Sequence, residues 1–273
     1  MSTESPSGPE ASGPPGPGPG TPAEPAGHGL LAGRTVLVTA AAGTGIGFAT
    51  AKRCVEEGAR VVISDAHERR LGEAAERLGD AVAAALPCDV TVEEQVRALF
   101  DGAVAATGGL DVVVNNAGLG GEAPVVDMTD EQWSKVLDVT LNGTFRCTRA
   151  ALRHLLPRRA GVIVNNASVL GWRAQPGQAH YAAAKAGVMA LTRCAAMEAA
   201  PAGVRVNAVA PSLAMHPFLA KVTTDELLEE LTRREAFGRP AETWEVANVI
   251  VFLASDYSTY MTGEVVSVSS QHP

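Results

Sequence analysis

Aromatic residues, basic residues and long apolar runs are all scarce in this chain. Only 4% of its 273 residues are aromatic, so the core has to be built from alanine, valine and leucine, which suit helices packed closely on a parallel sheet. No stretch approaches the roughly 18 to 20 uninterrupted apolar residues of a membrane span, so no membrane partner is expected. The formal net charge of −8 argues against nucleic acid as the main partner.

Cysteine is also rare. The four cysteines, Cys54, Cys88, Cys147 and Cys194, lie far apart and form no C-x-x-C pair. This spacing argues against both a metal site and a disulfide framework. Reduced thiols in a cytoplasmic protein are therefore expected, with no bound metal.

Glycine and proline are concentrated at the N-terminus. Residues 1–29 hold seven Gly and eight Pro and almost no apolar side chains. Such a segment cannot bury enough apolar surface to offset the entropy of ordering, so residues 1–29 are predicted to form a disordered tail. The remaining residues, 30–273, are expected to form one domain.

Short β-branched runs alternate with amphipathic stretches from residue 34 onward. Strands are expected at residues 34–39, 60–64, 110–115, 161–165, 204–209 and 264–268, with a weaker one ending near residue 89. Helices are expected at residues 93–105, 129–154, 181–200 and 243–254, the first of them starting with a capping box of Thr91 and Glu94. Near-continuous apolar strands indicate burial on both faces. The predicted fold is therefore α/β, a single Rossmann-type, doubly wound parallel sheet with helices on both faces.

A glycine-rich loop joins the first expected strand to a helix. It contains Gly43, Gly45 and Gly47. Glycines let the backbone approach a pyrophosphate closely, and the N-terminus of the following helix offers free N–H groups. A merely tight turn between strand and helix is the alternative, and the context of strand, loop and helix favours the nucleotide.

Two carboxylates end the next two strands. Asp65 lies 18 residues after Gly47 (65 − 47), where it can accept hydrogen bonds from both ribose hydroxyls and repel a 2′-phosphate; this favours NAD over NADP. Arg69 and Arg70 follow closely and could accommodate a phosphate, so NADP stays open. Asp89 ends the third strand, where it either meets an adenine amino group or closes a turn.

Three residues further along can carry proton transfer. Ser168 follows the fifth expected strand, and Tyr181 and Lys185 come later at helical i and i+4 spacing, so phenol and ammonium share a face. A tyrosine alone is a poor base, because its ordinary pKa is about 10. A neighbouring Lys⁺ and an oxidised nicotinamide are expected to lower the pKa of Tyr181. The set suits interconversion of a carbonyl and an alcohol, with hydride passing to or from the cofactor.

These motifs resemble the short-chain dehydrogenase/reductase family over about residues 31–270. The resemblance implies that Ser168 orients the substrate oxygen, that Tyr181 is the catalytic acid or base, and that Lys185 lowers the pKa of Tyr181 and binds the nicotinamide ribose. It also implies a homotetramer or homodimer, formed through the helices near residues 129–155 and 181–200. The implied cofactor site consists of Thr39, Gly43, Gly45, Ile46, Gly47, Asp65, Asp89, Val90, Asn116, Ala117, Gly118, Tyr181, Lys185 and Pro211.

The chain departs from the family pattern at several positions. Ala40 replaces a glycine of the glycine-rich loop, and His216 replaces a threonine that contacts the nicotinamide. Thr140 stands where the family has an asparagine that anchors a relay water, and we keep Thr140 as a fourth catalytic candidate. Asn142, two residues further on, is expected to point elsewhere.

Several local stretches resemble an actinobacterial subgroup that acts in steroid-ring degradation. They are residues 40–47, 167–175 and 213–216 and the C-terminal Gln271-His272-Pro273, and the subgroup oxidises a ring alcohol of a hydroxy-indanone thioester of coenzyme A. The resemblance implies NAD-dependent interconversion of a secondary alcohol and a ketone on a bulky alicyclic acyl-CoA. Trp172, His216 and Phe218 are the candidate substrate walls, although Phe218 is equally well interpreted as a core residue.

Two other functions stay open. A 3-oxoacyl-thioester reductase, acting on acyl-carrier-protein or CoA esters, would be favoured by a preference for NADPH. A non-catalytic, nucleotide-binding regulatory protein is a different class. The intact set of Ser168, Tyr181 and Lys185 argues against it.

Overall fold

Seven parallel strands form one central sheet. The computed structural model describes residues 20–215 and 224–271. The strand order is β3-β2-β1-β4-β5-β6-β9, which confirms the predicted doubly wound sheet. The strands are β1 (Thr35–Val38), β2 (Arg60–Asp65), β3 (Val82–Pro87), β4 (Val112–Asn115), β5 (Gly161–Asn166), β6 (Val204–Pro211) and β9 (Val265–Val268).

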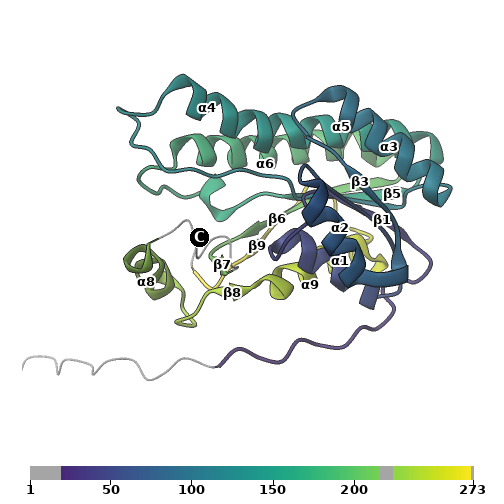
Figure 1. Cartoon of the computed structure of the whole chain (residues 1–273), viewed down its shortest axis with the longest axis horizontal. Coiled ribbons are helices and arrows are strands. Elements are labelled where there is room, and N and C mark those ends of the chain that lie inside the picture. Colours follow the sequence, from purple (N-terminus) through teal and green to yellow (C-terminus); the bar gives the residue numbers. More distant parts are fainter. Residues whose placement is uncertain (1–19, 216–223, 272–273) are drawn as a thin grey trace, which may run out of the picture.

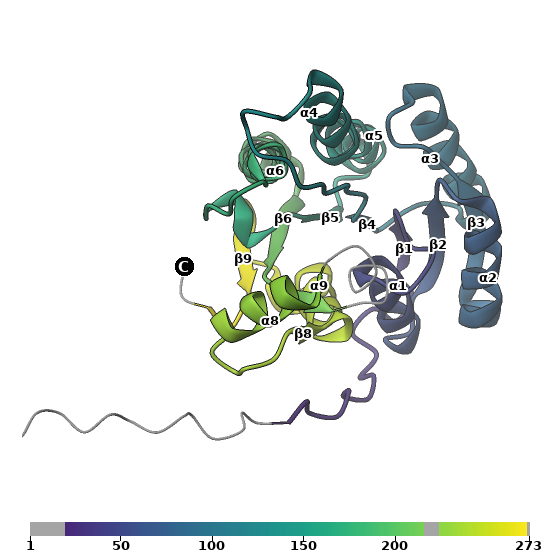
Figure 2. The ribbon, with the colours of Figure 1, turned by 60° about the vertical axis from the view of Figure 1, so that its left-hand side comes forward.

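Helices cover both faces of this sheet (Figure 1). One face packs against α3 (Glu93–Thr107), α5 (Gly143–Arg158) and α6 (Ala179–Ala199), with α4 (Asp130–Leu137) leading into α5. The other face packs against α1 (Ile46–Glu56), α2 (Glu68–Leu78) and α9 (Thr243–Ala254), as Figure 2 shows. The short sheet of β7 (Ala214–Met215) and β8 (Ala241–Glu242) and the helix α8 (Asp225–Arg234) complete the described fold. None of the helices within the described ranges is long and apolar enough to cross a bilayer.

Alternation along the central strands explains why helices are needed on both faces. In β1, Val36 and Val38 pack with the helices of one face, whereas Leu37 packs with those of the other, and all three side chains are fully buried. Successive side chains of a strand point to opposite faces, so an apolar run of this kind requires cover on both sides. The order of strands reverses between β1 and β4, and in such sheets ligands bind at the carboxyl ends of the strands at this point.

Two details of the predicted helices are wrong. The helix expected over residues 129–154 is divided by a π-helical turn, Asp138–Asn142, between α4 and α5. The capping box predicted for α3 does not form, because the N-cap residue is Val92. The Thr91 hydroxyl instead donates a hydrogen bond to Asp89 Oδ1 at 2.8 Å.

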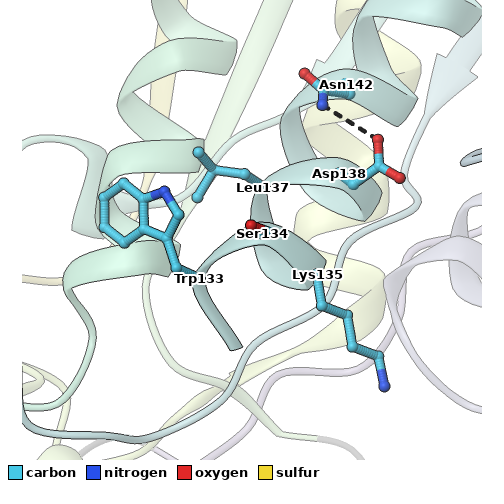
Figure 3. Close-up of a pocket in the computed structure, with 6 residues that line it drawn as sticks. All are labelled: Trp133, Ser134, Lys135, Leu137, Asp138 and Asn142. Carbon is cyan, nitrogen blue, oxygen red and sulfur yellow. Dashed lines mark hydrogen bonds between the residues drawn. The ribbon is translucent and has the colours of Figure 1, made fainter. Parts of the chain in front are cut away.

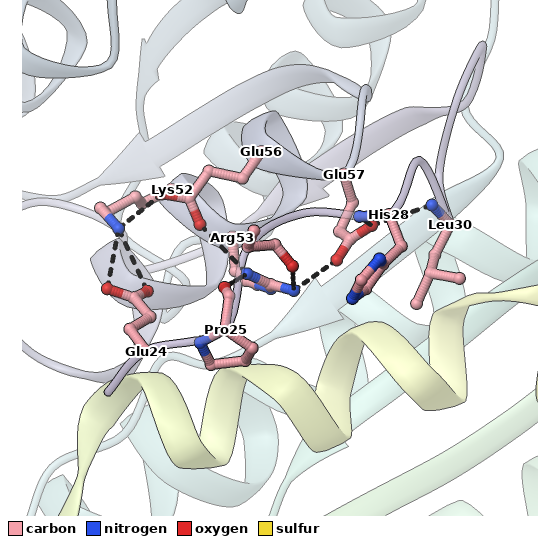
Figure 4. Close-up of polar contacts among 9 residues, drawn as sticks. Glu24, Pro25, His28, Leu30, Lys52, Arg53, Glu56 and Glu57 are labelled. Atoms are coloured by element: carbon pink, nitrogen blue, oxygen red, sulfur yellow. Dashed lines mark hydrogen bonds and ion pairs between the residues drawn. The ribbon is translucent and has the colours of Figure 1, made fainter. Parts of the chain in front are cut away.

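A buried ion pair on α1 holds the segment that precedes β1 (Figure 4). Arg53 Nη2 lies 2.5 Å from Glu57 Oε1, and both side chains are almost completely buried. The same guanidinium donates to the carbonyl oxygens of Pro25 at 2.5 Å and Ala26 at 3.1 Å. Residues 24–28 are part of the predicted disordered tail, but here they contact α1; residues 1–19 lie outside the described residues.

The Glu57 carboxylate also accepts hydrogen bonds from the backbone of the segment that precedes β1. Its Oε2 accepts hydrogen bonds from the backbone N–H groups of His28 at 2.8 Å and Leu30 at 2.9 Å. Burial alone would raise the pKa of the Glu57 carboxyl, but the two amides and Arg53 outweigh it and leave the pKa below its ordinary value. The stability that Glu57 contributes is therefore present at neutral pH and is lost as the pH falls through its folded-state pKa.

We expect Arg53→Met to lower the free energy of unfolding by about 3–5 kcal/mol, because it leaves the Glu57 carboxylate buried without its cation. Urea unfolding at neutral pH measures the change. The matched control is Arg97→Met, which removes an ion pair with Glu93 whose arginine side chain is 62% exposed. That variant should lose less than about 1 kcal/mol. Equal losses for the two variants would show that the buried pair has no special role.

Candidate active site

The loops that follow β1 and β4 are joined by hydrogen bonds through Asn116. Its Nδ2 donates to the Ala40 carbonyl oxygen at 3.1 Å, and its backbone N–H donates to Thr39 Oγ1 at 2.9 Å. Asn116 Oδ1 accepts a hydrogen bond from Asn166 Nδ2, at the end of β5, at 2.9 Å. Thr39 and Asn116, both predicted cofactor residues, therefore hold the edge of the sheet in place.

The glycine-rich loop leaves open space in front of α1. Gly43 has a φ of +111°, and a Cβ added to Gly43 or Gly45 would meet no atom within 4 Å. Gly45 is the N-cap of α1, and no side chain caps this helix terminus. A Cβ on Gly47, in contrast, would lie 2.2 Å from the Ala40 carbonyl oxygen, so only glycine fits there. The first N–H groups of α1 are thus available to an anion.

Asp65 borders the same loop at the end of β2. One carboxylate oxygen accepts a hydrogen bond from the Ala42 N–H at 3.2 Å, and the other accepts from the His67 N–H at 3.0 Å. Desolvation raises the pKa of this carboxyl above its ordinary value, although the Ala42 amide and the nearby charge of Arg70 act in the opposite direction. Arg69 pairs instead with Glu73 at 2.6 Å on the exposed side of α2.

The other predicted cofactor residues lie at the carboxyl ends of their strands. Asp89 Oδ1 accepts hydrogen bonds from the backbone and the hydroxyl of Thr91, so it closes a turn. Val90 is buried, and a Cβ on Gly143 would lie 2.6 Å from Val90 Cγ2, which places Val90 against the start of α5. Pro211, at the end of β6, is buried as well.

Ser168, Tyr181 and Lys185 come together as predicted. Ser168 follows β5, and its side chain is hydrogen-bonded to Tyr181 near the start of α6. Lys185 Nζ lies 5.5 Å from the centroid of the Tyr181 ring and donates a hydrogen bond to the Asn166 carbonyl oxygen at 2.6 Å. Ser168 and Lys185 are buried, whereas Tyr181 keeps part of its surface exposed.

The pKa values of Tyr181 and Lys185 differ from the expectation. Desolvation raises the pKa of Tyr181 to about 12, and only the hydrogen bond with Ser168 opposes it. Desolvation lowers the pKa of Lys185 to about 8. The expected lowering of the Tyr181 pKa by Lys185 is therefore not found here. The reason is that removal from water disfavours the charged form of both groups.

Thr140, the fourth catalytic candidate, is fully buried in the π-helical turn. Its hydroxyl donates to the Leu119 carbonyl oxygen at 3.1 Å and accepts from the Leu119 N–H at 3.0 Å. The hydroxyl is thus bonded to the loop after β4, and a role in holding a relay water stays a prediction. Asn142 is exposed and points away, as expected, with its Nδ2 3.1 Å from Asp138 Oδ1.

Asn142 belongs to a separate hollow on the outside of α4 (Figure 3). This hollow has a volume of about 470 Å³ and is lined by Trp133, Ser134, Lys135, Leu137, Asp138 and Asn142. None of the predicted site residues lines it.

On the substrate side, the structure describes only one of the three candidates. Trp172 follows the Ser168 loop and is 48% exposed. His216 and Phe218 lie outside the described residues. The sequence reasoning missed Arg77 of α2, whose guanidinium lies 3.9 Å from the centroid of the Phe48 ring and donates to the Gly43 carbonyl oxygen at 3.2 Å. It also missed Glu235, a buried carboxylate after α8.

The residues present fit a dinucleotide cofactor. The open space at Gly43 and Gly45 in front of an uncapped helix N-terminus suits a pyrophosphate. Asn166 Oδ1 is buried and has no hydrogen-bond partner in the described structure, although the Nδ2 atom of the same amide is bonded. Buried polar atoms normally find partners, so a free acceptor at this edge of the sheet indicates a position for a ligand.

Comparisons with known proteins agree with this geometry. The family model described as enoyl-(acyl carrier protein) reductase matches residues 40–270. A relative from Mycobacterium tuberculosis, named (5R,7aS)-5-hydroxy-7a-methyl-1-oxo-2,3,5,6,7,7a-hexahydro-1H-indene-carboxyl-CoA reductase, is 65% identical over 92% of this chain and 98% of its own. A cis-4-hydroxycyclohexanecarboxylate dehydrogenase from Sinomonas cyclohexanicum is 43% identical over 87% of this chain and 96% of its own.

A solved structure is similar throughout. The crystal structure of a short chain dehydrogenase from Mycobacterium smegmatis has a TM-score of 0.82 and 61% identity, and the match covers 92% of this chain and 98% of that one. The family model and these relatives confirm the resemblance predicted from the motifs. The chain therefore belongs to the short-chain dehydrogenase/reductase family of oxidoreductases.

Proposed function

We propose that this protein interconverts a secondary alcohol and a ketone on a bulky alicyclic acyl-CoA derived from a steroid ring, with NAD as cofactor. The observation that carries the proposal is the 65% identity to a hydroxy-indene-carboxyl-CoA reductase, over nearly the whole length of both chains. The second relative, a dehydrogenase of a hydroxycyclohexane carboxylate, also acts on a ring alcohol by its name. The Ser168, Tyr181 and Lys185 set supports turnover rather than a regulatory role without catalysis.

The chain's own residues divide the work of proton transfer. The Ser168 hydroxyl donates a hydrogen bond to the substrate oxygen and orients it. Tyr181, which is hydrogen-bonded to Ser168, gives a proton to that oxygen in ketone reduction and takes it back in alcohol oxidation. Lys185, fixed by the Asn166 carbonyl oxygen, lies beside the ring of Tyr181; in its charged form it favours the phenolate and opposes the desolvation that raises the Tyr181 pKa. When bound, the nicotinamide supplies or accepts the hydride.

The residues around the glycine-rich loop would hold the adenosine diphosphate half of the cofactor. The N–H groups at the start of α1 would meet the pyrophosphate, and the Asp65 carboxylate would accept hydrogen bonds from the ribose hydroxyls. A carboxylate at this point repels a 2′-phosphate, which supports NAD over NADP. Lys185 and Asn166 would face the nicotinamide half.

We also propose a homotetramer or homodimer located in the cytoplasm. Trp133 on α4 and Phe145 on α5 are 40% and 43% exposed. Exposed apolar side chains of this size favour a helix face that is covered by another subunit. Three of the four cysteines are buried as free thiols, which is compatible with a reducing compartment. We keep the proposed division of the chain into a tail, residues 1–29, and a domain, residues 30–273.

A panel of hydroxyacyl thioesters tests the proposed substrate. We expect NAD reduction with a bicyclic hydroxy-indane carboxyl-CoA to have a kcat/KM at least about tenfold above that with 3-hydroxybutyryl-CoA. The reason is that a site shaped for fused rings gains little binding free energy from a short acyl group. A preference for 3-hydroxybutyryl-CoA together with NADP would favour the 3-oxoacyl-thioester reductase instead.

In the same assay, Tyr181→Phe should lower kcat by at least about 100-fold while NAD binding is retained, because only the proton donor is lost. The matched control is Tyr257→Phe, since Tyr257 is 74% exposed. A Tyr181→Phe variant that keeps near-normal rates would refute the assigned mechanism.

Asp65→Ala should erode the preference for NAD. With the carboxylate gone, binding of NAD weakens and repulsion of the 2′-phosphate ends, so the ratio of kcat/KM for NAD to that for NADP should fall by at least about tenfold. Asp101→Ala, at an exposed position of α3, is the control. Equal use of NAD and NADP by the unaltered enzyme would contradict the role of Asp65.

The pH dependence should have opposite signs in the two directions. Alcohol oxidation needs the phenolate form of Tyr181. The pKa of the Tyr181 hydroxyl is about 12. Between about pH 6 and about pH 10 the oxidation rate should therefore rise with pH, and the reduction rate, which needs the phenol, should not rise. In Lys185→Met the rise should move to higher pH, whereas Lys135→Met, at an exposed position, should leave it in place. A Lys185→Met profile that superimposes on that of the unaltered enzyme would contradict the role of Lys185.

A further inference from the structure

Glu235 is a buried carboxylate that none of the predicted roles uses. It follows α8, and only 4% of its surface is exposed. Its Oε2 accepts a hydrogen bond from Ser270 Oγ at 2.6 Å, and its Oε1 accepts from Gln271 Nε2 at 2.7 Å and from the Leu213 N–H at 3.4 Å. Burying a carboxylate is costly unless its lone pairs are satisfied, so these contacts are needed by the charge itself.

Gln271 extends these contacts to the loop of the catalytic serine. Its Oε1 accepts a hydrogen bond from Arg173 Nη1 at 2.5 Å, and its backbone carbonyl oxygen accepts from Arg173 Nη2 at 3.2 Å. Arg173 belongs to the turn after Ser168, because its N–H donates to the Val169 carbonyl oxygen at 3.0 Å. The Gln271 side chain is thus hydrogen-bonded to both Glu235 and Arg173.

The residues of this bridge all lie at the carboxyl edge of the sheet. Gln271 comes just after β9, and Leu213 comes just after β6, whose neighbour is β9. The Ser212 N–H donates to the Val268 carbonyl oxygen at 3.1 Å, which keeps the two strand ends together. Figure 1 shows β7 and β8 beside β9, with α8 further to the left. Ligands of such sheets bind beyond this edge.

We propose that the Glu235–Gln271–Arg173 bridge positions the substrate side of the site and sets its selectivity for bulky acyl thioesters. The inference rests on the proposed function. By joining the turn after Ser168 to the segment after β6 and to the end of α8, the bridge fixes the separation of the walls between which a fused-ring acyl group has to fit. The three residues are positioning residues: they act through the Ser168 turn and the Leu213 backbone. Ser270 and Gln271, which follow β9, are then part of the site.

Gln271→Ala is the direct test, since it removes the side-chain contacts with both Glu235 and Arg173. We expect KM for the bicyclic hydroxy-indane carboxyl-CoA to rise about tenfold, with KM for 3-hydroxybutyryl-CoA and Kd for NAD changing less than about twofold. Glu235→Gln should raise KM for the bicyclic thioester as well. The control Glu264→Gln, at an exposed position before β9, should change none of the three constants. A rise of KM that is equal for both thioesters would overturn the proposed selectivity.

A double variant checks that the bridge acts as one unit. Because Arg173 and Gln271 contact each other, Arg173→Ala combined with Gln271→Ala should raise KM for the bicyclic thioester by clearly less than the product of the two single effects. Effects that multiply would show that the two residues act separately, and would overturn the bridge.

Backbone hydrogen exchange gives a readout that does not depend on turnover. In Gln271→Ala, exchange should become faster at residues 168–173 and 212–215 as well as near Glu235, but not in α3. Faster exchange confined to residues 268–271 would overturn the bridge. If the unaltered enzyme turns over none of the thioesters, the proposed function fails, while the exchange result still decides whether the bridge joins these segments.

Discussion

A chain of hydrogen bonds from the glycine-rich loop to Lys185 is the constraint on which the rest of the candidate site depends. The Ala40 carbonyl oxygen accepts from Asn116, Asn116 accepts from Asn166, and the Asn166 carbonyl oxygen accepts from Lys185 at 2.6 Å. Each link joins the carboxyl end of a different strand, or the helix α6, to its neighbour. Because the links are part-buried, losing one leaves a polar group without a partner, which typically costs about 1–3 kcal/mol. The loops that follow β1, β4 and β5 and the first turns of α6 are therefore held together.

The same requirement for satisfied buried charge is found at both ends of the described chain. Near the N-terminus, Glu57 gathers two backbone amides and Arg53 around its carboxylate. Near the C-terminus, Glu235 gathers Ser270, Gln271 and a backbone amide. In each case one buried carboxylate ties a terminal segment to the domain, because it accepts hydrogen bonds both from that segment and from the rest of the domain.

Much of this fold and site could be predicted from sequence, because the signals are local. Apolar runs indicate the strands, and their alternation requires helices on both faces. Spacing of four residues on a helix places Tyr181 and Lys185 together.

Glu235 and Gln271 could not be predicted, since they are separated by 36 residues and no period relates them. The Thr91 capping box does not form because the helix begins one residue later, with Val92 as the N-cap, and the Thr91 hydroxyl donates to Asp89. Ala40 departs from the family glycine, and its φ of +50° in the left-handed region shows why glycine is usual there.

Thr140 shows how a substitution at a family position is accommodated. A single hydroxyl both donates to and accepts from the Leu119 backbone, at 3.1 and 3.0 Å. Threonine is shorter than asparagine, so this double contact requires the helix backbone to approach the loop closely, and Thr140 lies in a π-helical turn. Such turns occur frequently at functional sites. The loop that Thr140 holds includes Gly118, where a Cβ would lie 3.4 Å from Lys185 Nζ. Thr140 therefore fixes the loop that borders Lys185.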